Sequence, residues 1–96
     1  MTSVFLLVLL ALTPTLHIEA TCRGEEKRLP ADQQSVAYKS CLQDEQDARK
    51  ALDAKWTQIP VVDRTNCTEL GRMFESYVEL KVCIEIRASS AFAPKP

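Results

Sequence analysis

The sequence is poor in two residue types on which many catalytic and nucleotide-binding motifs depend. Its 96 residues include one histidine, His17, and two glycines, Gly24 and Gly71. Serine and cysteine nucleophiles need a histidine as general base in the common catalytic arrangements, and a phosphate-binding loop needs several glycines close together. The carboxylates are scattered among basic residues, so no tuned acid–base pair stands out. We therefore expect no enzymatic activity and no cofactor.

The chain also lacks an excess of charge of either sign. It carries 12 basic and 13 acidic residues, a net charge of −1, and the two signs are interspersed. Binding to DNA, RNA or an anionic membrane surface usually depends on a basic patch or stripe. We therefore do not expect nucleic acid among the partners of this protein.

Long apolar runs are limited to one, near the N-terminus. Residues 4–12 are all apolar, a run that is shorter than the about 20 residues of a membrane-spanning helix but typical of the core of a signal peptide. Pro14 ends the run, and Ala20 is a small residue suited to the position before a cleavage site. We predict a signal peptide over residues 1–20. A buried helix of a cytosolic protein and a retained anchor are the alternatives, since the residues before the run include no Lys or Arg.

Cleavage after Ala20 changes the composition of the chain. It removes His17 and Glu19, which leaves 12 acidic and 12 basic residues and no histidine. Cys22 then lies next to the new N-terminus, but Glu19 and Thr21 are not the aliphatic and small residues that a lipid-attachment signal requires. We expect an exported protein without lipid or transmembrane segment, in the periplasm or outside the cell.

Four cysteines remain after cleavage: Cys22, Cys41, Cys67 and Cys83. In a short exported chain, an even number of cysteines indicates disulfides, here two with three possible connectivities. A zinc site usually has closely spaced cysteine pairs, whereas these cysteines lie 19, 26 and 16 positions apart. We expect two disulfides and no metal, with a free thiol as a further alternative.

The predicted mature chain of 76 residues needs such cross-links. A domain of that size buries only about 60% of the surface that its unfolded chain exposes, so its core alone gives marginal stability. A disulfide that closes a loop of roughly 40 residues adds about 4 kcal/mol in the chain-entropy model. The cross-links therefore contribute as much as the net stability of a small fold.

Most of the mature chain favours helix. After a polar lead-in over residues 21–33, the segment 34–59 lacks glycine and proline and has apolar residues at steps of three and four. This stripe, with Glu45 at its edge, comprises Tyr38, Cys41, Ala48, Leu52, Trp56 and Ile59. A second helix is expected over residues 61–70, after Pro60, with Gly71 as the residue just past its end.

Residues 77–87 fit two kinds of secondary structure. Apolar residues at positions 78, 80, 82, 84 and 86 alternate with others, a pattern typical of a half-buried strand. A lone strand cannot pair its backbone groups, and no second strand of comparable quality exists in the sequence. Ser76 and Glu79 form a capping box, which marks the start of a helix. We predict a helix here, followed by a disordered tail over residues 89–96.

The expected fold is therefore all-α, a small disulfide-linked helical hairpin or three-helix domain over residues 34–88. If residues 60–87 run back along the first helix, Cys83 comes level with Cys41, and Cys22 is left to reach Cys67. An up-down-up bundle would instead join Cys67 to Cys83 and Cys22 to Cys41. We predict the first arrangement, with the pairs Cys41–Cys83 and Cys22–Cys67.

Several motifs between residues 39 and 86 carry a resemblance. They are Lys39-Ser40-Cys41-Leu42, Trp56, Asp63-Arg64, Cys67, and Ser76-Tyr77-Val78-Glu79-Leu80 followed by Cys83-Ile84-Glu85. With these motifs the chain resembles short exported proteins with four or three cysteines, of unknown function, from rhizobia and related bacteria. It departs from that group between Gly71 and Glu75, where the group has paired glycines and a proline. The resemblance implies export, helices and structural cysteines, and it implies no activity.

The function that these features favour is that of a non-catalytic binding or interaction module in the periplasm or cell envelope. Its partner would be a protein or an envelope component that the sequence does not identify. A secreted, disulfide-stabilised peptide effector that acts on other cells is the alternative, and the neutral charge weighs against it. Trp56 and Tyr77 are candidate binding anchors, although their apolar neighbours favour places in the core.

Overall fold

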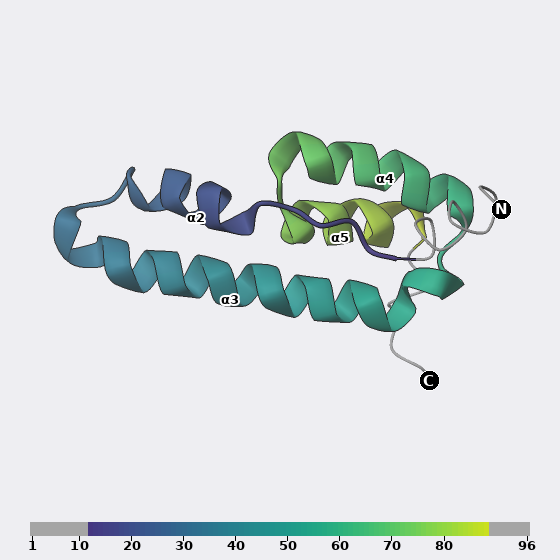
Figure 1. The fold of residues 1–96 in the computed structure, drawn as a ribbon, viewed down its shortest axis with the longest axis horizontal. Coiled ribbons are helices and arrows are strands. Elements are labelled where there is room, and N and C mark those ends of the chain that lie inside the picture. The colour runs from purple at the N-terminus through teal and green to yellow at the C-terminus, as the bar shows by residue number, and fades with distance from the viewer. Residues whose placement is uncertain (1–11, 89–96) are drawn as a thin grey trace, which may run out of the picture.

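The computed structural model describes residues 12–88. Over these residues it contains four α-helices, one short 3-10 segment and no strand (Figure 1). In chain order the elements are α2 (Ile18–Glu26), α3 (Ala31–Lys55), η1 (Trp56–Gln58), α4 (Val61–Phe74) and α5 (Tyr77–Arg87). The prediction of a small all-α fold is confirmed. The predicted tail over residues 89–96, and all but the last residue of the apolar run 4–12, lie outside the described residues.

Helix α3 is the longest element, because residues 31–55 contain neither glycine nor proline. Pro30 precedes it in an extended conformation, as expected for a residue that cannot donate a backbone hydrogen bond. The side chains that α3 buries are Glu45, Ala48 and Leu52, at steps of three and four, and Trp56 in η1 continues the row. In Figure 1, α2 lies along the N-terminal half of α3 and α5 along its C-terminal half.

The segment expected as a polar lead-in is largely helical. Helix α2 extends from Ile18 to Glu26, and its apolar contact with α3 includes the fully buried Cys22. The guanidinium of Arg23 lies 4.8 Å from the centre of the Tyr38 ring, which adds a cation–π contact between the two helices. The helical part of the chain therefore begins before residue 34.

Helices α4 and α5 form an antiparallel hairpin (Figure 1). Glu75 ends α4 in the left-handed conformation, with φ of 49°. Ser76 then caps α5, since its Oγ accepts a hydrogen bond from the backbone N–H of Glu79 at 3.2 Å. At the open end of the hairpin, Arg87 Nε lies 3.1 Å from Asp63 Oδ1. The prediction of a helix over residues 77–87 is confirmed.

Gly71 lies inside α4 and not just past its end, so the predicted end of this helix was wrong by four residues. A Cβ atom at position 71 would lie 3.1 Å from the Cβ of Leu80 in α5. The absence of a side chain therefore allows α4 and α5 to approach closely at this point. The glycine serves the packing of two helices and does not terminate one.

The core lies where α3, η1, α4 and α5 meet. Five of its side chains are completely inaccessible to solvent: Leu52, Cys67, Tyr77, Leu80 and Ile84. Trp56 is also buried, so both candidate aromatic anchors have the core positions that the sequence favours. The whole cluster comprises Leu16, Ala48, Leu52, Trp56, Ile59, Cys67, Tyr77, Leu80 and Ile84. Leu16 is the unexpected member, because it belongs to the predicted signal peptide.

The predicted disulfide pairs Cys41–Cys83 and Cys22–Cys67 were wrong. The structure joins Cys22 to Cys41, with Cα atoms 5.5 Å apart, and Cys67 to Cys83, with Cα atoms 5.6 Å apart. The prediction assumed that residues 60–87 run back along α3 as one arm, but the chain reverses at Glu75 and Ser76. This reversal brings the two cysteines of the α4–α5 hairpin face to face. Each disulfide therefore fastens one antiparallel helix pair.

Candidate functional site

An extended segment that we call the strap, residues 13–17, runs from the edge of the cavity described below to the start of α2. Figure 1 shows it as the dark purple stretch that crosses the α4–α5 hairpin. Pro14 and Leu16 are buried, whereas Thr15 and His17 are exposed. This alternation is that of an extended chain with one face against a surface. The strap therefore lies in a slot of the folded domain as a bound peptide would.

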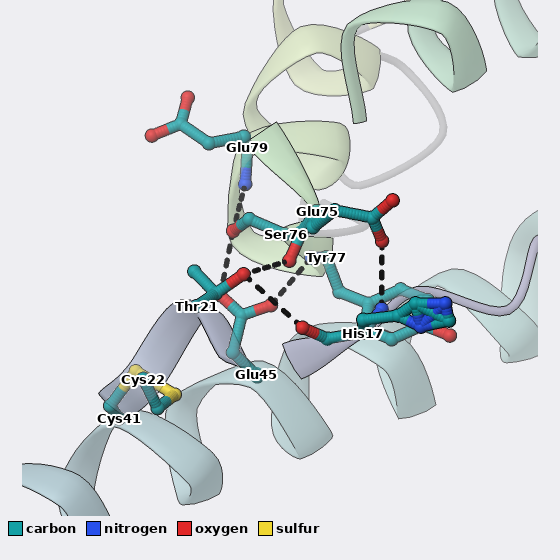
Figure 2. Close-up of a disulfide and its surroundings, with 9 residues drawn as sticks. All are labelled: His17, Thr21, Cys22, Cys41, Glu45, Glu75, Ser76, Tyr77 and Glu79. Atoms are coloured by element: carbon teal, nitrogen blue, oxygen red, sulfur yellow. Dashed lines mark hydrogen bonds between the residues drawn. A yellow bond between two sulfur atoms is a disulfide. The ribbon is translucent and has the colours of Figure 1, made fainter. Parts of the chain in front are cut away.

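The slot binds the strap through its backbone. The hydroxyl of Tyr77 donates a hydrogen bond to the carbonyl of Pro14 at 2.8 Å and accepts one from the N–H of Leu16 at 3.0 Å. The carboxylate of Glu75 accepts a hydrogen bond from the N–H of His17 at 2.8 Å (Figure 2). Glu75 lies in the turn between α4 and α5, and Tyr77 is the first residue of α5. The side chains of Pro14 and Leu16 are buried, and the hydroxyl of Thr13 donates a hydrogen bond to Asp53. The slot therefore contacts main-chain groups and three side chains.

Glu45 of α3 fixes the position of Tyr77. Its carboxylate is buried and accepts hydrogen bonds from Ser76 Oγ at 2.6 Å and from the N–H of Tyr77 at 2.5 Å (Figure 2). The N–H of Tyr77 is one of the backbone donors that have no partner within α5, and at this helix end the dipole also favours a negative charge. The expectation that Glu45 lies at the edge of the stripe was wrong, because the α5 N-terminus supplies partners that allow a carboxylate to be buried.

The start of α2 is bound to the same turn by residues that follow the predicted cleavage site. Thr21 Oγ1 donates a hydrogen bond to the carbonyl of Glu75 at 2.8 Å. The next residue, Cys22, is linked to Cys41 on α3. Figure 2 shows this disulfide beside the hydrogen-bonded group of the turn. Helix α2 is therefore attached to the domain independently of the strap.

A cavity of about 580 Å³ lies beside the strap. Its wall includes residues 12–15 together with Trp56, Val61, Arg64 and Arg72. The indole N–H of Trp56 is buried and has no hydrogen-bond partner among the described residues. The cavity thus adjoins the N-terminal part of the strap, and residues 12–15 form part of its wall.

The outer face of α5 carries a second feature, a row of three exposed apolar side chains. Val78, Val82 and Ile86 lie four residues apart and are 37%, 44% and 78% exposed. Leu80 and Ile84 lie on the opposite face of the helix and are completely buried. The strand-like alternation of apolar residues therefore arises because one helix has two buried apolar residues on one face and three exposed ones on the other.

Among residues 12–88, no group of three or more His, Cys, Asp or Glu side chains is arranged to hold a metal ion. All four cysteines are in disulfides. No helix in the same part of the chain is both long enough and apolar enough to cross a membrane.

Sequence reasoning identified the four cysteines and the two buried aromatic residues but missed the slot. Pro14 and Leu16 were assigned to a segment that processing removes, so they were not considered for the core. Glu75 has no motif around it that marks a peptide-binding group. The capping box at Ser76 was the one available signal, because it locates the start of α5 and therefore Tyr77.

Comparison of the chain with models of protein families, with curated proteins and with solved structures finds no match in any of the three.

Proposed function

We propose that this protein is exported, loses residues 1–20, and acts outside the cytoplasm as a small non-catalytic binding module. The observation that carries this proposal is the position of the strap. Residues that the predicted cleavage would remove fill a slot through contacts with Tyr77 and Glu75 and through the burial of Leu16. Their removal would empty the slot and leave the hydroxyl of Tyr77 and the carboxylate of Glu75 without the strap groups that they bind.

Three further features support export. The apolar run 4–12 has the length of a signal-peptide core. Two disulfides are compatible with an oxidising compartment. The resemblance to short exported proteins of rhizobia and related bacteria points in the same direction. The expected location is the periplasm or the cell envelope, where the module would bind a protein or an envelope component.

Fractionation of cells that produce the full chain tests this function. We expect the protein in the periplasmic or envelope fraction, shortened by its signal peptide, with no cysteine that reacts with a thiol reagent before reduction. Accumulation in the medium would favour the alternative of a secreted peptide effector. A cytoplasmic protein of full length with reactive thiols would contradict the proposal.

A pair of substitutions tests the position of the predicted cleavage site, one at the site and one elsewhere as its control. Ala20→Leu should block processing, because the residue before the cleavage site must be small. Ala20 is exposed in α2, so the change should leave the fold intact. Ala54→Leu, also exposed on a helix, should be processed normally. Equal processing of both variants would place the cut elsewhere.

A further inference from the structure

We propose that the slot emptied by cleavage binds an extended peptide segment of a partner protein. That segment would place an aliphatic side chain where Leu16 lies and a backbone carbonyl where that of Pro14 lies. This inference rests on the proposed function, since it requires that the strap leave the domain. The chain itself provides the model of the ligand, because its own residues 13–17 fill the slot.

The contacts of the strap define what a ligand must present. Its backbone makes three hydrogen bonds to Tyr77 and Glu75, through the Pro14 carbonyl and the N–H groups of Leu16 and His17. The hydroxyl of Thr13 donates one more to the carboxylate of Asp53 in α3. Every extended peptide offers such backbone groups, so they supply affinity without sequence preference, as in other complexes of extended peptides. Selectivity then depends on the two buried side chains and on Thr13, whose hydroxyl binds Asp53. Thr15 and His17 are exposed and leave their positions free to vary.

Proline suits its position in the strap for a physical reason. The ring fixes φ and removes a donor. In the slot the ring of Pro14 is buried, and its carbonyl accepts the hydrogen bond from Tyr77. A ligand with proline two residues before its aliphatic residue therefore loses less conformational freedom when it binds. We expect a sequence with proline, any residue and then leucine or a similar side chain to bind best.

The groups that form the slot do not depend on the strap for their own position. Tyr77 is the first residue of α5, and its N–H is bound to the buried carboxylate of Glu45. The disulfide Cys67–Cys83 fastens α5 to α4, the two helices that flank the turn with Glu75. Thr21 and Cys22 hold the rest of α2 after residues 18–20 are lost. A preformed site of this kind avoids the entropic cost of ordering a loop when the peptide binds.

The cavity beside the strap indicates the path that a longer bound peptide would take, and it contains a tryptophan that can report binding. Residues 12–15 and Trp56 both belong to the wall of this cavity. A peptide that continues toward its N-terminus past the position of Pro14 would therefore run along this wall. Trp56 is the only tryptophan of the chain, so a change in its fluorescence reports occupancy of this end of the site.

The test uses the exported protein after its N-terminal residue has been determined as Thr21. A synthetic peptide with the sequence of residues 12–20 is added while tryptophan fluorescence and heat are measured. We expect saturable binding with one site and a change in the Trp56 emission. A peptide with Leu16→Asp should bind about a hundredfold more weakly, since it places a charge in an apolar site. A peptide with Thr15→Ala should bind within about twofold of the original, because Thr15 is exposed.

Two protein variants complete the test. Tyr77→Phe keeps the ring in the core but removes the hydroxyl that binds the strap twice, so it should weaken peptide binding by about tenfold. Tyr38→Phe, whose ring lies under Arg23 on the other half of α3, should bind as the parent does. Circular dichroism of each variant checks that the fold is intact.

The outcomes separate this inference from the proposed function. If the exported protein starts before Pro14, the strap stays in its slot, and the proposed processing and the inference both fail. If the protein starts at Thr21 but is unfolded, or binds the original and the Leu16→Asp peptides equally or not at all, the peptide site is wrong while the export proposal stands. Binding that Tyr77→Phe leaves unchanged would also contradict the inference.

Discussion

Glu45 illustrates how one buried carboxylate can organise a site that lies far from it in the sequence. Its partners, Ser76 and Tyr77, are 31 and 32 residues away. Helical periodicity places Glu45 on the same stripe as Ala48 and Leu52, but it contains no information about which helix end will lie opposite. The sequence therefore predicted which face of α3 carries Glu45, but it did not predict that this side chain is buried.

At the scale of single residues, we predict that Glu45→Ala destabilises the domain by about 2 kcal/mol, because it leaves a buried hydroxyl and a backbone N–H without partners. Asp44→Ala is the matched control, since Asp44 is the exposed neighbour, and should change stability by less than about 0.5 kcal/mol. Urea denaturation of the oxidised proteins measures both. Equal effects of the two substitutions would argue against the role of Glu45 as a cap of α5.

At the scale of elements, α5 offers a test of helix against strand. Leu80→Ala should cost about 2–5 kcal/mol, because it opens a cavity in the core. Val82→Ala should cost less than about 0.5 kcal/mol, since Val82 is exposed. In a strand with apolar residues on alternate positions, both side chains would share the buried face. Comparable losses for the two variants in thermal denaturation would therefore contradict the helix.

The two glycines should respond in opposite ways to alanine. Gly24→Ala in α2 meets no atom within 4 Å and should stabilise the domain by about 0.5–1 kcal/mol, the difference in helix propensity. Gly71→Ala places a Cβ 3.1 Å from that of Leu80. It should be destabilising, because α4 and α5 must separate to admit it. Stabilisation by both substitutions would show that the close approach of these helices is not required.

The helices could be predicted from the sequence because their signals are local. The absence of glycine and proline from 31–55 and the capping box at Ser76 each act within a few residues. The end of α4 could not be predicted, since Gly71 resembles a terminating glycine until its contact with Leu80 is known. The strand-like alternation of residues 78–86 was resolved correctly only because no second strand was available to pair with it.

At the scale of the whole molecule, local sequence signals did not predict which cysteines pair. Both predicted pairs were wrong because the connectivity depends on two reversals of the chain. One lies between α2 and α3, and the other, at Glu75 and Ser76, lies between α4 and α5. The same turn supplies Tyr77 and Glu75 to the strap slot. The disulfide Cys67–Cys83 and the candidate site are therefore two results of the reversal between α4 and α5.

One measurement tests the central claim, a domain of two disulfide-fastened helix pairs from which the strap has been removed. The exported protein is digested with trypsin without reduction, and the masses of the linked peptides are determined. No Lys or Arg lies before Arg23, so the peptide that contains Cys22 reports the N-terminus and the disulfide partner together.

The account predicts that residues 21–23 are linked to residues 40–49, and residues 65–72 to residues 82–87. A link between 40–49 and 82–87 would contradict the fold. A Cys22 peptide that begins before Pro14 would contradict the removal of the strap.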